Sequence, residues 1–437
     1  MHMRFWRMLS GSPTGTAAQP PVCNPAPPQK LRTCSIGSAR SSASWREWRW
    51  ASQRAALQPS SPARPFGQVR LQRCSEAGRA EWLDALRGIT IAIMLVVNSL
   101  GSEADNYAML CHSEWNGFTL ADWVFPCFLF IVGASIALSL AKHEGDEWRR
   151  KSIYLRVLRR AAVLFALGVL LNGFPDYDMS SLRIMGVLQR IALAYILASA
   201  IILSLRRQEI WVLCGILLAG YWLLMAYFPV PGFGAGDLSA AGNLAAYIDR
   251  LAFAPEHLLG GGPTEPEGLL ATLPASVNVL SGYLVAEWLR SQPPASATSL
   301  RLTCISVFTL LAGCTWGYYF PLNKQLWTSS YTVYSTGWSL LFLSFCYYAI
   351  EIRQWRRWSG PFIAMGTNAI FVYMASEIVE KLLCYGAPDQ GGRAWMFREF
   401  FSWADPETGS FLYGIAITGL WCLVLYGMRK RSLQFKV

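Results

Sequence analysis

Residues 121–141 read ADWVFPCFLFIVGASIALSLA, and Asp122 is the only charged residue among them. An α-helix of this length extends for about 31 Å, which matches the hydrocarbon core of a bilayer at about 30 Å. The stretch lacks the alternation of polar and apolar residues that is typical of a strand in a membrane barrel. It therefore predicts a transmembrane helix.

Apolar runs of similar length recur along the chain after residue 80. Of all 437 residues 53% are hydrophobic and 15% are charged, whereas soluble domains usually carry about 25% charged residues. A soluble globular protein is therefore excluded, and we predict an all-α fold, a polytopic bundle of about ten transmembrane helices. The predicted spans lie near residues 84–101, 121–141, 158–174, 184–204, 210–228, 269–289, 302–320, 331–350, 361–382 and 411–428.

The basic residues between the spans predict how the bundle is oriented. Alternate connections are rich in Lys and Arg, and the positive-inside rule places such connections in the cytoplasm. Both ends of the bundle are then cytoplasmic, and the loops around His112, Asp176, Asn243 and Trp327 lie outside. The basic connections contain Arg149 to Arg160, Arg206 and Arg207, Arg290 and Arg301, Arg353 to Arg357, and Arg429 to Arg431.

The strong positive charge of the chain comes from residues 1–80. This segment holds twelve Lys and Arg against two Glu, and the remainder holds 26 basic and 25 acidic residues. The body therefore carries no charge excess that would indicate a nucleic-acid partner. The Pro, Ser and Arg bias of residues 1–80 predicts either a disordered basic leader or a mis-assigned start, before a transmembrane domain at 81–437.

Two of the predicted spans carry polar stripes. Asp84, Arg87 and Asn98 fall within about 60° of one helical face over about 21 Å. Charged groups in a span usually face the bundle interior, but Asp84 and Arg87 could also be a pair that only neutralises itself. In the fourth span, Gln189 lies beside Arg190, whose guanidinium is too deep for a membrane anchor and requires an anionic partner, from the protein or from a ligand.

The outer loop before residue 121 carries the candidate catalytic histidine, His112. A single loop histidine is often only a surface residue, but Trp115, Asn116 and Asp122 follow it closely. Thr119 is a plausible helix cap, and Pro126 in an early turn is expected to leave backbone amides free. Eleven scattered cysteines without any CxxC spacing predict no metal site.

Several motifs resemble the heparan-alpha-glucosaminide N-acetyltransferase family and its bacterial relatives. They are the run Leu83 to Gly88, Val97-Asn98, His112 to Gly117 and Phe125-Pro126. The resemblance covers nearly all of residues 80–437, with Cys127 and Glu265 as departures from the family pattern. Further matching motifs are Gly186 to Ile191, Asn243 to Asp249, Pro266 to Gly268 with Thr272 to Pro274, Pro321 to Lys324 with Leu326 to Ser329, and Gly366 with Asn368 to Ile370.

The resemblance implies a multi-pass enzyme of the cell (inner) membrane that transfers acetyl groups from cytoplasmic acetyl-CoA to an amino sugar or glycan end outside. His112 matches the histidine that the family uses for catalysis, and the chemistry allows either a general base or an acetyl carrier. Asn98 and Asn116 are candidate oxyanion donors, and Asp122 is the candidate residue that orients the imidazole. The candidate substrate-binding residues are Asp84, Arg87, Trp115, Gln189, Arg190, Lys324, Trp327 and Asn368.

Two further expectations follow from the topology. The phosphates of acetyl-CoA stay inside while His112 lies outside, so the thioester needs a deep polar cavity. The basic loop 149–160 is a candidate phosphate site, although the positive-inside rule alone explains it. The alternative function is that of a transporter or uptake partner for N-acetylglucosamine. The lipid bilayer is an expected partner of the chain. A second copy of the chain, in a homodimer, is the alternative to a monomer.

Overall fold

The structure is a computed structural model that describes residues 80–437 except 103–104, 142–148, 385–390, 432 and 434–437. These residues belong to one compact unit, Cys74–Val437. The expectations for residues 1–79 lie outside the described residues. The prediction of a leader before residue 81 therefore stays a prediction.

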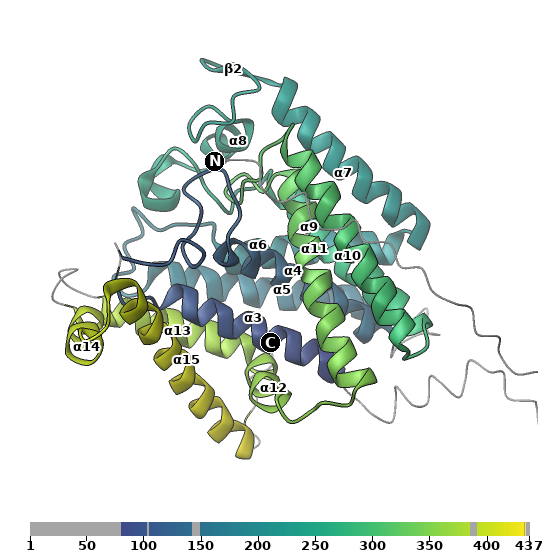
Figure 1. Ribbon diagram of the computed structural model, residues 1–437. Helices are drawn as coiled ribbons and strands as arrows, with labels where there is room; N and C mark the ends of the chain where they lie inside the picture. The colour runs from purple at the N-terminus through teal and green to yellow at the C-terminus, as the bar shows by residue number, and fades with distance from the viewer. Residues whose placement is uncertain (1–79, 103–104, 142–148, 385–390, 432, 434–437) are drawn as a thin grey trace, which may run out of the picture. The chain divides into compact units, whose positions relative to one another are not determined.

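The described unit is a bundle of helices, which confirms the all-α class (Figure 1). Its only β-structure in the described residues is a two-residue ladder, β1 (Pro229–Val230) with β2 (Gly234–Ala235). The long helices are α3 (Glu81–Asn98), α4 (Leu120–Leu140), α5 (Arg149–Gly173), α6 (Val187–Ser204), α7 (Arg207–Tyr227), α9 (Thr272–Ser291), α10 (Ser296–Gly317), α11 (Ser329–Tyr347), α13 (Ala369–Leu383) and α15 (Pro406–Lys430). The shorter elements are α8 (Leu244–Ala252), η2 (Pro255–His257), η3 (Leu259–Gly261), η4 (Tyr348–Ile352), α12 (Ser359–Thr367) and α14 (Gly392–Phe401).

Six helices of the described residues are long and apolar enough to cross a membrane, namely α4, α6, α7, α10, α11 with η4, and α15. The pair α12 and α13 makes a seventh span if it is counted as one. The other predicted spans coincide with α3, α5 and α9, which are not among these six helices. The chain is thus a multi-pass membrane protein, whereas the number ten and the cytoplasmic position of both ends stay predictions.

Glycines allow the central helices to approach closely. A Cβ atom at Gly133 of α4 would lie 1.7 Å from the carbonyl oxygen of Val279 in α9. At Gly282 of α9 it would lie 1.9 Å from the carbonyl oxygen of Phe130 in α4. Small residues bring membrane helices together in this way, since lipid supplies no hydrophobic driving force between them. The α4–α9 pair consequently forms a close-packed centre on which the other helices pack.

The predicted span 361–382 is wrong as a continuous helix. It divides at Asn368 into α12 and α13, which meet at 81°. The backbone of Asn368 leaves helical geometry at φ −119° and ψ 31°, and Arg87 donates a hydrogen bond to the carbonyl oxygen of Gly366 at 3.2 Å. An external donor thus satisfies a carbonyl near the break, which is how broken helices are tolerated inside membrane proteins.

Candidate active site

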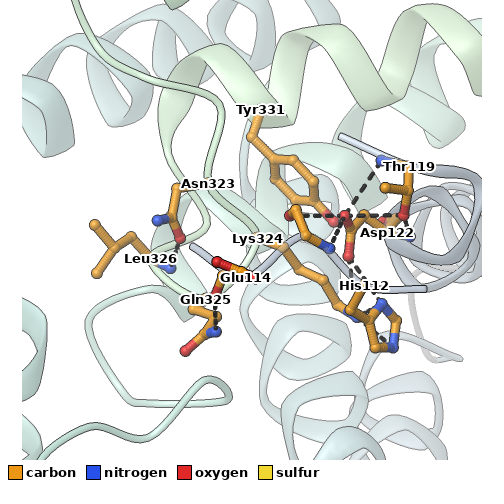
Figure 2. Close-up of polar contacts among 10 residues, drawn as sticks. His112, Glu114, Thr119, Asp122, Asn323, Lys324, Gln325, Leu326 and Tyr331 are labelled. Carbon is orange, nitrogen blue, oxygen red and sulfur yellow. Dashed lines mark hydrogen bonds and ion pairs between the residues drawn. The ribbon is translucent and has the colours of Figure 1, made fainter. Parts of the chain in front are cut away.

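His112 and Asp122 form a hydrogen-bonded pair at the start of α4 (Figure 2). The Nδ1 atom of His112 lies 2.8 Å from Oδ1 of Asp122. A carboxylate only accepts hydrogen bonds, so Nδ1 carries the hydrogen of this contact. In the neutral ring, Nε2 then carries a lone pair, which a general base or a nucleophile requires.

The sequence folds this way locally because Asp122 is part of a helix cap. Thr119 caps α4, its Oγ1 accepting from the Asp122 amide at 3.3 Å while Oδ2 of Asp122 accepts from the Thr119 amide at 3.2 Å. Oδ2 also accepts from the backbone and the hydroxyl of Ser113 at 3.2 and 2.9 Å. The Asp122 side chain is 1% exposed and that of His112 is 52% exposed, so a fixed carboxylate holds an accessible imidazole.

Lys324 approaches the pair from the loop between α10 and α11 (Figure 2). Its Nζ lies 3.1 and 3.2 Å from the two ring nitrogens of His112 and 3.7 Å from Oδ1 of Asp122. Burial lowers the pKa of Lys324, although the negative charges of Asp122 and Glu267 oppose this effect. The lysine therefore places a hydrogen-bond donor directly beside the ring.

The two loops that carry His112 and Lys324 are tied to each other and to the helices. Gly117 donates to the carbonyl oxygen of Leu322 at 2.8 Å, and Asn323 donates to Oδ1 of Asn116 at 3.2 Å. The hydroxyl of Tyr331 in α11 donates to the backbone oxygen of Asp122 at 2.6 Å (Figure 2). These bonds fix the positions of the histidine and lysine loops relative to α4.

A cavity of about 690 Å³ opens beside the imidazole. It extends from His112 past Phe125 and Phe128 of α4 to Ala369 at the start of α13. Ligand pockets typically have volumes of about 300–1,000 Å³ and mostly apolar walls, so the cavity has the size of a small-molecule site. The ring of His112 consequently does not lie over solid packing.

The structure brings together five of the candidate residues at this cavity. They are Asn98, His112, Asp122, Lys324 and Trp327. Among the residues that line the cavity, the sequence analysis did not single out Glu267, Glu377 or Lys381 as site residues. Glu377 and Lys381 could have been found, because charged residues within a predicted apolar span are themselves a signal.

Asp84 and Arg87 do not line the cavity. Arg87 pairs with Asp84 at 2.8 Å and donates to Ser135 of α4 at 2.9 Å. Together with its bond to Gly366, the guanidinium links α3 to α4 and α12. This geometry favours the structural interpretation of the pair, in which the arginine fastens three helices together.

Four further candidates also lie outside the cavity lining. The indole of Trp115 donates to the carbonyl oxygen of Leu238 at 3.0 Å, and Asn116 binds Asn323 as described above. Gln189 donates to the carbonyl oxygen of Ile184 at 3.0 Å. Asn368 is buried at the α12–α13 break, where it determines the helix geometry rather than the wall of the cavity.

Arg190 is fully buried behind the cavity wall. Its Nη2 donates to the carbonyl oxygen of Gly268 at 3.1 Å, and its guanidinium lies 4.9 Å from the ring centre of Trp327. The charge of Arg190 lowers the pKa values of Glu267 and Asp249, although burial raises both. Glu267 and Asp249 thus act on Arg190 through their charge, but in the described residues neither carboxylate forms an ion pair with it.

The polar end of the cavity contains an arginine held by two glutamates. Arg183 donates through Nε to Oε2 of Glu265 at 3.1 Å and through Nη2 to Glu267 at 2.6 Å. Burial alone would raise the pKa of Glu267, but the charges of Arg183, Arg190 and Lys324 hold it below its ordinary value. A carboxylate is therefore kept ionised at the cavity wall.

The expected phosphate site has no counterpart in the cavity lining. Arg156 and Arg159 of α5 are exposed, and neither lines the cavity. Within the described part of the chain, no group of three or more His, Cys, Asp or Glu side chains is arranged to hold a metal ion. The cavity lining supplies imidazole, carboxylate, ammonium, guanidinium, hydroxyl and amide groups.

Comparisons with known proteins identify the family of the chain. A family model described as heparan-alpha-glucosaminide N-acetyltransferase, catalytic, matches residues 79–314, more than half of the chain. The heparan-alpha-glucosaminide N-acetyltransferase of Mus musculus is 28% identical over 424 residues, with 84% of this chain and 61% of the relative covered. That of Homo sapiens is 27% identical over 417 residues, with coverages of 82% and 60%. The chain thus spans about three fifths of the length of these relatives.

Proposed function

Because the chain belongs to the family of heparan-alpha-glucosaminide N-acetyltransferase catalytic regions, we propose that it is a membrane acetyltransferase. It takes the acetyl group from acetyl-CoA on the cytoplasmic side and transfers it to the amine of an amino sugar on the outer side. The observation that carries this proposal is the His112–Asp122 pair, which lies at 2.8 Å beside a cavity leading into the bundle.

The chemistry follows from the groups at the cavity. A thioester is attacked only by a neutral amine, and in one route Nε2 of His112 takes the proton that the amine must lose. Alternatively, Nε2 attacks the thioester carbonyl carbon, the C–S bond breaks and the CoA thiolate leaves with a proton from the solvent; the amine then takes the acetyl group from Nε2 and releases a proton. In both routes a negative charge develops on the carbonyl oxygen, and the amide of Asn98 and the ammonium of Lys324 are its candidate donors.

The location follows from the same proposal. The enzyme is a protein of the cell (inner) membrane with both ends of the bundle in the cytoplasm, as the positive-inside rule favours. Its partners are the surrounding lipids and a small amino sugar or glycan end, with no nucleic acid. A homodimer remains a proposal that size determination in a defined detergent tests directly.

A direct assay tests the transfer. Full-length protein in nanodiscs receives acetyl-CoA labelled in the acetyl group together with glucosamine, and we expect label in N-acetylglucosamine. Protein-free nanodiscs measure the uncatalysed reaction. A wild-type protein that binds acetyl-CoA but transfers no label above this background to any amino sugar would contradict the proposal.

The broken α12–α13 pair is the observation that favours the alternative, a transporter for N-acetylglucosamine. Secondary transporters often bind their substrates at discontinuous helices near the middle of the membrane. Proteoliposomes loaded without acetyl-CoA provide the test. Flux of N-acetylglucosamine under these conditions would support transport, whereas label transfer without flux supports the acetyltransferase.

A further inference from the structure

Most of the charged groups around the cavity already contact an opposite charge or a polar backbone. Asp122 lies near Lys324 and His112, and Glu267 is held by Arg183. The ammonium of Lys381 donates to the carbonyl oxygens of Leu171 and Phe174 at 2.6 and 3.0 Å. These contacts satisfy the hydrogen-bonding groups without any ligand.

Glu377 is the exception. This residue lies on α13 and lines the same cavity as His112. Its Oε1 accepts a hydrogen bond from Nδ2 of Asn98 in α3 at 3.0 Å. Among the described residues, no Lys, Arg or His forms an ion pair with the Glu377 carboxylate within 4.0 Å. Lys381 lies one turn further along α13, but its ammonium donates its hydrogen bonds to the carbonyl oxygens of Leu171 and Phe174. A carboxylate with free acceptor positions thus faces the cavity without a contacting cation.

We propose that Glu377, positioned by Asn98, binds the ammonium group of the acceptor, so that the acceptor is a primary amine that arrives as a cation. This inference rests on the proposed acetyl transfer and names the group that recognises the substrate. A carboxylate accepts several N–H bonds at once, and such charge-assisted bonds are about twice as strong as neutral ones. A sugar with a hydroxyl in place of the amine lacks the charge.

The proposed binding step fits a balanced reaction. The ammonium held by Glu377 loses one proton to a base of the cavity, for which Nε2 of His112 is placed. The neutral amine then attacks the thioester carbonyl carbon, so that the C–N bond forms and the C–S bond breaks. The thiolate leaves and takes up a proton, which gives an N-acetyl amine, CoA thiol and one proton released to solvent. Glu377 is thus a substrate-binding group and takes no part in the covalent steps.

Equilibrium binding of two sugars tests the proposal without requiring turnover. Glucosamine and glucose differ in the amine, and both are titrated by calorimetry into full-length protein in nanodiscs at pH 7. We expect wild type to bind glucosamine at least about tenfold more tightly than glucose, and Glu377→Gln to lose this preference. The Gln side chain retains an oxygen that accepts from Asn98, so its effect reports the charge.

Glu380→Gln is the matched control. Glu380 lies on the same helix, pairs with Arg393 at 3.2 Å and does not line the cavity, so its removal changes the charge of α13 equally. We expect this variant to keep the preference for glucosamine. The proposal is overturned if wild type shows no preference, if Glu377→Gln retains it, or if Glu380→Gln loses it equally. If Glu377→Gln fails to fold, Glu377→Asp replaces it, with weaker glucosamine binding expected and unchanged binding overturning the proposal.

The same proteins distinguish this inference from the proposed function. If glucosamine binds with a preference that depends on Glu377 but labelled acetyl is never transferred, the ammonium site stands and the acetyltransferase fails. If acetyl is transferred while Glu377→Gln leaves the KM for glucosamine unchanged, the acetyltransferase stands and the ammonium site fails.

Discussion

Nδ1 of His112 lies 2.8 Å from Oδ1 of Asp122, and the same carboxylate caps α4 through its second oxygen. The cap fixes the carboxylate by local backbone geometry, before any substrate is present. One residue therefore serves both the helix and the imidazole. Mutations around it should separate effects on catalysis from effects on stability.

Replacing His112 by Ala should abolish acetyl transfer and leave the fold intact. The rate is expected to fall by about 10² to 10⁴, the usual contribution of a general acid or base. The melting temperature should hardly change, because the side chain is 52% exposed. Labelled acetyl-CoA measures transfer, and label trapped on wild type but not on the variant after a rapid denaturing quench near neutral pH would identify an acetyl-histidine. A variant that retains most of the wild-type rate would exclude His112 from the chemistry.

Asp122→Asn should reduce both rate and stability. An amide has one accepting oxygen, so it cannot serve His112 and the donors from Ser113 and Thr119 as the carboxylate does. We expect a rate loss of at least about 10² and a destabilisation of about 1 kcal/mol from the weakened cap.

Thr119→Ala is the control for that experiment. It removes the hydroxyl that accepts from the Asp122 amide at 3.3 Å and leaves the carboxylate in place. A similar loss of stability with most of the rate retained is expected, measured by thermal unfolding and label transfer. Equal rate losses in the two variants would show that Asp122 acts only through the fold.

Gly133→Val should strongly destabilise the bundle. The Cβ of the new valine would lie 1.7 Å from the carbonyl oxygen of Val279, so α4 and α9 must move apart. Such overpacking lowers the free energy of unfolding by about 1–3 kcal/mol. Gly419→Val in α15 is the control, because nothing lies within 4 Å of its Cβ position. Thermal unfolding in nanodiscs compares the two, and equal melting temperatures would argue against the close α4–α9 contact.

Asp249 should make the stability of the protein depend on pH. Burial raises the pKa of this carboxyl, which lies in α8, from 3.8 to about 6. A carboxyl whose pKa is raised by folding stabilises the fold below pH 3.8, and this stability is lost as the pH rises through 6, by about 3 kcal/mol. Asp249→Asn should therefore raise the melting temperature relative to wild type at pH 7.5, with a smaller gain at pH 4.5.

The exposed Asp178 provides the comparison for that pH series. Hydrogen bonds from Ser180 and Ser181 lower the pKa of Asp178, so Asp178→Asn should show no such gain at pH 7.5. If Asp249→Asn raised the melting temperature equally at pH 7.5 and pH 4.5, burial of the Asp249 charge would not be the cause of the gain.

The sequence by itself determined the helical membrane character of the chain, because the length and apolarity of each run are local properties. It also indicated the Thr119 cap and the candidate pair of His112 and Asp122, since these two residues are ten positions apart around the start of one helix. The resemblance in the motifs of residues 83–126 identified the family, which the match to residues 79–314 confirms.

Only the tertiary structure placed Lys324 beside His112, 212 residues away, and Glu377 beside Asn98, 279 residues away. It also turned Asp84 and Arg87 away from the cavity and divided the expected span at Asn368. Hydrophobic runs determine which segments enter the membrane, but they do not determine which faces meet. The faces that meet depend on how closely the helices pack at residues such as Gly133. They also depend on which buried polar groups can form hydrogen bonds with one another after packing.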